Sequence, residues 1–191
     1  MHFTVEAQKF AKQHLSLGAI AIDATCGNGF DTLFLAENVG GSGVVYGVDI
    51  QARAIENVRL KLLERGTLTQ CRLVNDSHSN LDTIVDADHV GRVSVVMFNL
   101  GYLPFGDKTI VTTPTTTLAG LEHALALIET GGLISVLAYP GHAGGLEESR
   151  CVGDWIEQQR TSLEWEKFLD EGNANSPILW LLKKRDEKAA R

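Results

Sequence analysis

Short apolar runs alternate with amphipathic stretches along most of the chain. Apolar runs of about four to eight residues between polar or glycine positions are typical of buried strands, whereas apolar residues three and four positions apart are typical of helices. The alternation of these two patterns predicts strand-helix-strand units around a mostly parallel sheet. We expect its strands at residues 19–23, 44–48, 71–74, 93–99 and 133–139.

Helical spacing is clear in five stretches. The first carries Phe3, Ala7, Phe10 and His14 on one side of an opening helix. Further helices are expected at 32–38, 52–64, 116–129 and 147–159. Gly66 and the pair Gly131-Gly132 are the expected stop signals, because glycine commonly ends a helix. The stretch after Asp76 follows neither pattern.

The end of the chain shows two strand-like runs, 164–169 and 178–183, with no room between them for a crossover helix. Such a pair is expected to form an antiparallel hairpin. An α/β sheet that is otherwise parallel and closes with this hairpin resembles the seven-stranded, Rossmann-like fold of class I S-adenosylmethionine-dependent methyltransferases, with helices on both faces. A ligand is then expected over the carboxyl ends of the strands.

Composition narrows the class of protein. The length of 191 residues predicts a single domain over 1–191, and the average content of hydrophobic (44%) and charged (21%) residues predicts a folded one. The net charge of −7 gives no general attraction to nucleic acid or to a membrane. No apolar run is long enough for a membrane span, and the first residues are too polar for a signal peptide, so we expect a cytoplasmic protein. The three widely spaced cysteines indicate neither a disulfide framework nor a metal site.

A glycine-containing loop, Asp23-Ala24-Thr25-Cys26-Gly27-Asn28-Gly29-Phe30-Asp31, follows the first expected strand. Its glycines allow a sharp turn and close approach to a ligand. A carboxylate at Asp31 is unfavourable beside a diphosphate, which argues against NAD. The pattern instead resembles motif I of methyltransferases, whose acid and loop amides hold the amino acid half of S-adenosylmethionine. By this resemblance the cofactor contacts are Asp23, Thr25, Gly27, Asn28, Gly29, Asp31 and Thr32. We expect Cys26 to be a packing residue.

Two more acids stand at the ends of the next expected strands. Asp49, followed by Ile50, lies where a carboxylate accepts both ribose hydroxyls, a position that also serves NAD. Asp76, followed by Ser77 and His78, lies where related enzymes place the acid that accepts from the adenine amino group. A capping role is the alternative for Asp76.

The fourth strand delivers Asn99-Leu100-Gly101-Tyr102-Leu103-Pro104, at the position of the Asn/Asp-Pro-Pro-Tyr/Phe element of amino-group methyltransferases. The amide oxygen of Asn99 can hold amine hydrogens so that the nitrogen lone pair points at the methyl group. Asn99 and Leu100 are also expected to contact the cofactor. Tyr102 can stack a base, and a packed loop aromatic is the alternative.

An alkylammonium acceptor must lose a proton before it attacks. His142, in Pro140-Gly141-His142-Ala143, is our candidate base, with solvent as the alternative. We expect Glu147 and Glu148 to favour the start of the following helix. His14 is a candidate for closing over the cofactor, with a purely structural histidine as the alternative. Covalent pyrimidine methylation is disfavoured, because no cysteine stands between Cys71 and Cys151.

Longer motifs carry a family resemblance: DATCGNGFDTLFLAE, GVDIQ, NDSHSNLD, NLGYLPFGDK, VTTPTTT and AYPGHAGGLEE, within residues 14–183. They are similar to the YtqB-like family of putative rRNA methylases, which includes MnmM-type tRNA methyltransferases. The resemblance implies a homodimer that uses S-adenosylmethionine, yields S-adenosylhomocysteine and methylates the aminomethyl group of 5-aminomethyl-(2-thio)uridine at the tRNA wobble position. Phe105 departs from the family pattern, in which glycine often follows the proline.

Binding of the tRNA anticodon region requires basic residues. The candidates are Arg53, Arg59, Lys61 and Arg65 on the second of the expected internal helices, and Lys183, Lys184, Arg185, Lys188 and Arg191 at the end of the chain. An rRNA or a small-molecule amine is the alternative acceptor. A nicotinamide-dependent oxidoreductase and a binding protein without turnover are alternatives of another class. Asp31 and the terminal hairpin argue against the first, and the Asn99 element argues against the second.

Overall fold

A seven-stranded sheet, in the order β3-β2-β1-β4-β5-β7-β6, forms the centre of the part of the chain that the computed structural model describes, residues 3–103, 109–170, 172–173 and 175–186. The strands are β1 (Ile20–Asp23), β2 (Val44–Val48), β3 (Cys71–Val74), β4 (Val93–Asn99), β5 (Ile128–Ala138), β6 (Leu163–Phe168) and β7 (Ile178–Lys184). The α-helices are α1 (Phe3–His14), α2 (Phe30–Val39), α3 (Ala52–Glu64), α4 (Leu81–Ile84), α5 (Pro114–Leu127) and α6 (Gly145–Gln158). Short 3-10 turns are η1 (Leu68–Gln70), η2 (His78–Asn80) and η3 (Ala87–His89).

The strand directions agree with the pattern of the sequence. β1 to β5 pair in parallel, and β7 runs antiparallel to both β5 and β6, so the expected terminal hairpin is confirmed. Parallel strands end at one edge of the sheet, and in this protein that edge collects the residues that follow Asp23, Val48, Val74 and Asn99.

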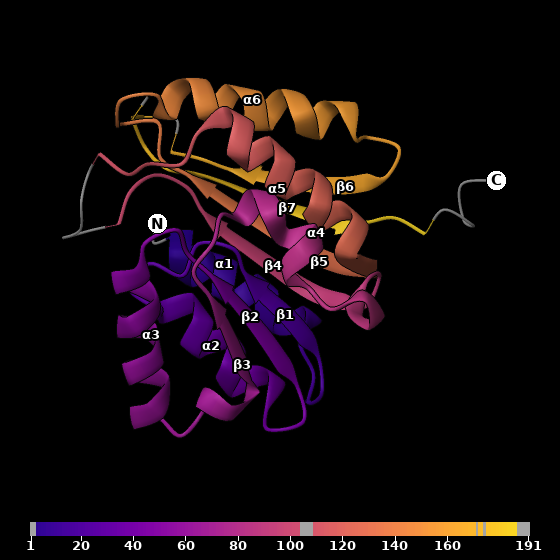
Figure 1. Cartoon of the computed structure of the whole chain (residues 1–191). Helices are drawn as coiled ribbons and strands as arrows, with labels where there is room; N and C mark the ends of the chain where they lie inside the picture. Colours follow the sequence, from indigo (N-terminus) through magenta and orange to yellow (C-terminus); the bar gives the residue numbers. More distant parts are fainter. Residues whose placement is uncertain (1–2, 104–108, 171, 174, 187–191) are drawn as a thin grey trace.

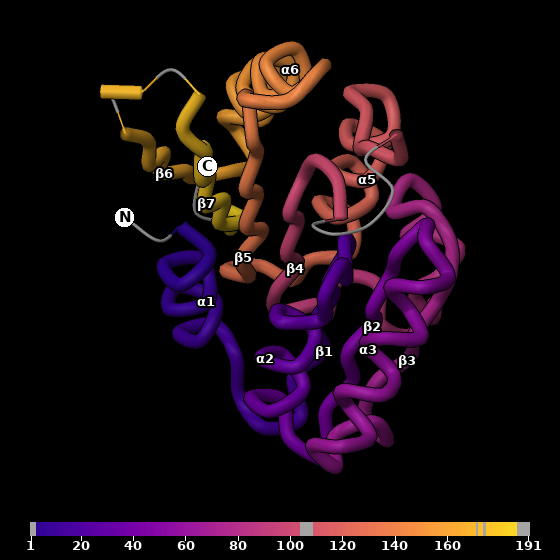
Figure 2. Tube along the Cα trace, turned by 90° about the vertical axis from the view of Figure 1, so that its left-hand side faces the viewer, coloured from indigo at the N-terminus to yellow at the C-terminus, as the bar shows by residue number. Residues whose placement is uncertain are grey.

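Helices cover both faces of the sheet, with α1, α2 and α3 on one side and α4, α5 and α6 on the other (Figures 1 and 2). Side chains alternate along a strand, and β4 serves both layers. Val96 and Phe98 pack in the core beneath α5 and α6, whereas Val95 and Met97 pack in the core beneath α1 and α2. Burial on both faces explains why β4 is a continuous apolar run rather than an alternating one.

The glycine pair Gly131-Gly132 is not the stop signal that the sequence suggested. α5 ends at Leu127 and β5 begins at Ile128, so both glycines lie inside the strand. Val93 pairs with Ile128 and Val95 pairs with Leu133, which leaves residues 129–132 as a wide bulge. A Cβ on Gly132 would lie 2.6 Å from Cγ1 of Ile128, so this bulge requires glycine. Gly66, with φ 69°, follows α3 as expected.

None of the helices in the described part of the chain is both long enough and apolar enough to cross a bilayer.

Candidate active site

A cavity of about 930 Å³ opens over the carboxyl ends of the parallel strands. Its wall is built from the loop after β1, the first residues of α2, the residues after β2, β4 and β5, the start of η2, and the first turns of α1. This volume lies in the range of sites for cofactors and other small molecules.

Most of the site residues expected from the sequence meet at this cavity. Those on its wall are Thr25, Gly27, Asn28, Asp31, Asp49, Ile50, Ser77, His78, Asn99, Leu100, Tyr102 and His142. Asp23, Gly29, Thr32 and Asp76 do not reach the wall. Their contacts show what each of them does instead.

Asp23 organises the glycine loop from beneath. It is fully buried and accepts hydrogen bonds from the backbone N–H of Thr25 (3.2 Å) and from the hydroxyl of Thr32 (2.5 Å). Burial and the nearby charge of Asp31 raise the pKa of Asp23 to about 7. Gly29, with φ 75°, allows α2 to start close to α3, because a Cβ there would lie 2.8 Å from Cγ2 of Val58. Asp23 therefore shapes the loop from below, whereas Asp31 and Asp49 lie on the cavity wall.

Asp49 ties the glycine loop to the end of β2. Its two carboxylate oxygens accept from the backbone N–H groups of Gly27 and Gln51, each at 2.8 Å. Burial raises the pKa of Asp49. Each oxygen retains a second lone pair, so the carboxylate can accept further hydrogen bonds from a ligand hydroxyl. Ile50 beside it exposes 63% of its surface at the cavity.

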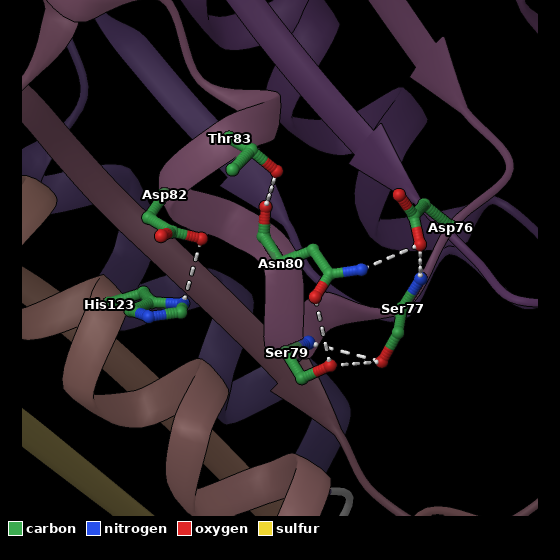
Figure 3. Close-up of polar contacts among 7 residues, drawn as sticks. All are labelled: Asp76, Ser77, Ser79, Asn80, Asp82, Thr83 and His123. Carbon is green, nitrogen blue, oxygen red and sulfur yellow. Dashed lines mark hydrogen bonds and ion pairs between the residues drawn. The ribbon is translucent and has the colours of Figure 1, made fainter.

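Asp76 stabilises the turn after β3. One carboxylate oxygen accepts from the backbone N–H of Ser77 (2.7 Å) and from Nδ2 of Asn80 (2.9 Å), and the other oxygen points away from both (Figure 3). The N-cap of η2 is Ser77, whose hydroxyl accepts from the backbone N–H of Ser79 (3.2 Å), so Asp76 stabilises the turn without being the cap itself. The turn places Ser77 and His78 on the cavity wall. His78 packs edge-on against Phe98, and burial lowers its pKa to about 4, so it is neutral at pH 7.

Asn99 is held by its backbone and by its side chain. Its backbone N–H donates to Oγ1 of Thr25 (2.7 Å), and its side-chain Nδ2 donates to Oδ2 of Asp31. Oδ1 of Asp31 in turn accepts from Nε2 of Gln8 on α1, at 2.6 Å. Asp31 is buried, and burial raises its pKa. The sequence does not indicate Gln8, because nothing in the pattern of α1 shows which polar residue lies over the sheet edge.

The segment after Asn99 leaves the sheet, and its two ends are joined by hydrogen bonds between Gly101 and Thr112. The backbone N–H of Gly101 donates to Oγ1 of Thr112 (2.8 Å), and the N–H of Thr112 donates to the carbonyl of Gly101 (2.9 Å). Tyr102 and Val111 form an antiparallel bridge just beyond this pair. Pro104 and Phe105, part of the expected motif, lie outside the described residues.

Glu148, on α6, holds Thr112 and thereby the joined ends of this segment. Its carboxylate accepts from the hydroxyl of Thr112 (2.8 Å) and from the hydroxyl of Thr117 on α5 (2.7 Å), and the residue is only 1% exposed. Both glutamates lie in the first turn of α6 as expected, but Glu148 is buried and has this further role, whereas Glu147 is exposed. The buried side chain connects α6, α5 and the joined ends of the segment.

His142 lines the cavity, and its ring meets that of Tyr102 edge-on, with centroids 5.8 Å apart. Nδ1 lies 2.9 Å from the carbonyl oxygen of Ala143, so Nδ1 carries the hydrogen and Nε2 is the basic nitrogen. Nε2 is buried and has no hydrogen-bond partner among the described residues. It lies against Gly101 and Gly145, where a Cβ would come within 3.3 and 2.9 Å. In this geometry the basic nitrogen does not open onto the cavity.

His14 is not a closing residue. Its Nδ1 donates to the carbonyl oxygen of Gly131 (3.1 Å), in the bulge before Leu133, at the edge of the sheet opposite to the cavity. The structural alternative for His14 is the one that its contacts support.

Exposed aromatic side chains surround the mouth of the cavity. Phe30 is 69% exposed, Tyr102 40% and Tyr139 37%, and all three line the cavity. The ammonium group of Lys61 lies 3.8 Å from the ring centroid of Phe30 and donates to the carbonyl of Asn28 (2.5 Å). Phe30 and Tyr139 were not among the expected site residues, although both lie within the quoted motifs.

Several of the candidate basic residues are engaged within the chain. Arg59 pairs with Glu56, Arg65 with Glu37 and Arg185 with Glu164, while Lys184 donates to the carbonyls of Leu125 and Ile128. Arg53 and Lys183 form no ion pair with a described residue. Lys188 and Arg191 lie outside the described residues. The described residues also contain no group of three or more side chains suited to hold a metal ion.

Comparison with known families gives one match over most of the chain. The model of a family described as putative rRNA methylase matches residues 45–181. A chloroplastic tRNA (mnm(5)s(2)U34)-methyltransferase of Arabidopsis thaliana is 42% identical over 163 residues, which are 76% of this chain and 58% of that protein. The chain thus spans less than two thirds of this relative.

Two solved structures are similar over nearly their whole length. A putative rRNA methylase from Clostridium thermocellum superposes with a TM-score of 0.91 at 38% identity, covering 96% of this chain and 98% of that one. A putative methyltransferase from Streptococcus mutans, solved in complex with SAH, superposes with a TM-score of 0.84 at 28% identity, with the same coverage. The Rossmann-like methyltransferase fold expected from the sequence is confirmed.

Proposed function

Because the chain belongs to the putative rRNA methylase family, we propose that it is an S-adenosylmethionine-dependent methyltransferase that acts on an amine of RNA. The observation that carries this proposal is the orientation of Asn99. Its amide nitrogen is turned to Asp31, which leaves the carbonyl oxygen as the polar group that Asn99 offers to the cavity. A carbonyl oxygen can accept the hydrogens of an amine and so direct the nitrogen lone pair.

The cavity fits the cofactor in size and chemistry. Asp49 has lone pairs free for the two ribose hydroxyls, and Ile50 and Leu100 offer apolar surface to the adenine ring. Ser77 and His78 bound the adenosine end of the cavity, and the loop of Thr25, Gly27 and Asn28 bounds the amino acid end. When bound, the cofactor supplies an electrophilic methyl group on a sulfonium. Gly101, fixed through Thr112, and Tyr102, bridged to Val111, then line the side from which the acceptor enters.

We propose the wobble uridine of tRNA, carrying a 5-aminomethyl group, as the acceptor. The similar Arabidopsis protein is named for a modified uridine at position 34. The aromatic rim of Phe30, Tyr102 and Tyr139 supports an RNA substrate, because proteins commonly hold unpaired bases against aromatic side chains. The acceptor ammonium must lose a proton before it attacks. In this proposal solvent takes that proton, because Nε2 of His142 is buried.

The proposal also covers where the protein acts, its oligomeric state and the part of the tRNA that it binds. We propose a cytoplasmic homodimer that binds the anticodon region, with two subunits adding their basic residues. The net charge is −7, so contacts to tRNA phosphates require a local basic surface. If such a surface binds the tRNA, the affinity should weaken steeply as salt is added. A filter-binding titration with tRNA against salt, together with light scattering for the oligomeric state, tests both points.

Transfer of labelled methyl groups is the direct test of the reaction. The protein is incubated with labelled S-adenosylmethionine and with tRNA or rRNA from cells that lack the gene, and the nucleosides are identified by mass spectrometry. We expect methylaminomethyluridine in tRNA alone. Label in rRNA alone, or in neither RNA despite measured cofactor binding, would contradict the wobble-uridine assignment.

The variant Asn99→Ala tests the amine-holding role. We expect kcat to fall by about 100-fold while the affinity for S-adenosylmethionine changes by less than about threefold, because the lost contact is made to the acceptor. An equal loss in both quantities would show that Asn99 serves the cofactor instead.

A further inference from the structure

Three side chains from three separate elements form a continuous hydrogen-bonded group on the cavity wall. Gln8 comes from α1, Asp31 from the first turn of α2 and Asn99 from the end of β4. Nε2 of Gln8 donates to one oxygen of Asp31 at 2.6 Å, and Nδ2 of Asn99 donates to the other. Asp31 is only 6% exposed, so this carboxylate is mostly shielded from water.

The chemistry of the group determines which end of each amide faces Asp31. An amide side chain has a donor end and an acceptor end of nearly the same size, whereas an ionised carboxylate only accepts. The observed contact, from Nδ2 of Asn99 to Oδ2 of Asp31, is the one that an ionised Asp31 selects. The carbonyl oxygen of Asn99 accepts no hydrogen bond from a described residue and remains available on the cavity side. An uncharged neighbour with both donors and acceptors would permit either orientation.

Two further contacts remove the remaining freedom of Asn99 and Asp31. The backbone N–H of Asn99 is held by the hydroxyl of Thr25, which fixes where the side chain starts. Gln8 occupies Oδ1 of Asp31, which leaves Oδ2 directed at Asn99. The N-terminal helix thus takes part in the geometry of the site, although it lies outside the sheet.

We propose that Asp31 is a positioning residue that orients the carbonyl oxygen of Asn99 toward the acceptor amine, and that Gln8 holds Asp31 in place for this task. The inference rests on the proposed function, because it assigns the means by which the amine-holding residue is oriented. It differs from the role expected from the glycine motif, in which Asp31 contacts the cofactor.

A double-mutant cycle separates the two roles. Asp31→Asn keeps the shape of the side chain but removes the acceptor-only character, so kcat should fall by about 10- to 100-fold, with the affinity for S-adenosylmethionine unchanged within about threefold. If Asp31 acts through Asn99, the same change made in an Asn99→Ala background should cost less than about twofold more. Gln8→Ala should give a smaller loss of kcat in the same direction. Asp82→Asn, an acid outside the cavity wall, is the matched control and should leave kcat unchanged.

Additive losses in the cycle would overturn the inference, as would a loss of cofactor affinity equal to the loss of kcat. A second readout does not depend on turnover: the side-chain amide resonance of Asn99 in NMR spectra. In the unmodified protein one Nδ2 proton should be shifted by its bond to Asp31, and Asp31→Asn should move that resonance. An unmoved resonance refutes the orientation. If no RNA is methylated but the resonance moves, the proposed function fails while the contact between Asp31 and Asn99 stands.

Discussion

Removing the carboxylate of Glu148 should destabilise the protein strongly, because it leaves two hydroxyl groups in the interior without their acceptor. Glu148 is 1% exposed and accepts from Thr112 and Thr117 at 2.8 and 2.7 Å. A hydrogen bond to a charged group contributes about 1.5–3 kcal/mol, so the loss of both in Glu148→Ala amounts to about 3–6 kcal/mol. For a protein of this size, that corresponds to a fall in Tm of about 6–24 °C.

The assay is thermal unfolding followed by circular dichroism, with Glu147→Ala as the matched control in the same helical turn. Glu147 is exposed, so its removal should shift Tm by less than about 2 °C. Glu148→Gln should lie between the two, since the amide oxygen can still accept from one threonine. Activity should fall in Glu148→Ala even below its Tm, because Thr112 holds the backbone N–H of Gly101. Equal melting temperatures for Glu148→Ala and Glu147→Ala would refute the anchoring role.

Three further outcomes are expected. Asp49→Asn should weaken binding of S-adenosylmethionine by about tenfold in calorimetry, because one acceptor for the ribose is replaced by a donor; unchanged affinity would place the ribose elsewhere. The pKa of Asp23 is raised from 3.8 to about 7, so between these pH values the folded protein keeps a proton that the unfolded chain has lost. The tighter binding of this proton stabilises the folded state at low pH, and that stabilisation should be lost as the pH rises from about 4 to above 7. The Tm should therefore fall more steeply with rising pH in the unmodified protein than in Asp23→Asn, and an equal pH dependence of Tm in both would contradict the raised pKa. Phe30→Ala should raise the KM for tRNA by about tenfold without changing the cofactor affinity, as expected for a lost stacking surface, whereas Trp165→Ala on the edge strand β6 should leave both unchanged.

Local patterns predicted the elements well, because periodicity reports on residues that are near in sequence. β2, β3, β4 and α3 have the predicted bounds, and the ends of the strands bring Asp49 and Asn99 to one cavity as expected. The bulge at Gly131-Gly132 could not be read in this way. A glycine that ends a helix and a glycine that permits a tight bulge look alike until the pairing of Val95 with Leu133 is known.

Contacts between distant segments account for the remaining differences. Asn99 and Asp31 are 68 positions apart, and Thr112 and Glu148 are 36 apart. No local pattern indicates which buried acid will meet which donor, so the place of Glu148 at a helix start could be predicted but its bonds to Thr112 and Thr117 could not. His142 followed the right strand, but the direction of its ring depends on the backbone of Gly101 and Gly145.

Gly101 and Thr112 hold together the two ends of the segment between them, and this affects how related enzymes can diverge. The two residues hold each other through both backbone and side chain, and Glu148 holds Thr112 from the body of the protein. Substitutions, insertions or deletions between them can therefore accumulate without loosening the sheet or the cofactor end of the cavity. Substrate preference can in this way evolve separately from cofactor binding, and an exchange of this segment between family members is a natural route to new acceptors.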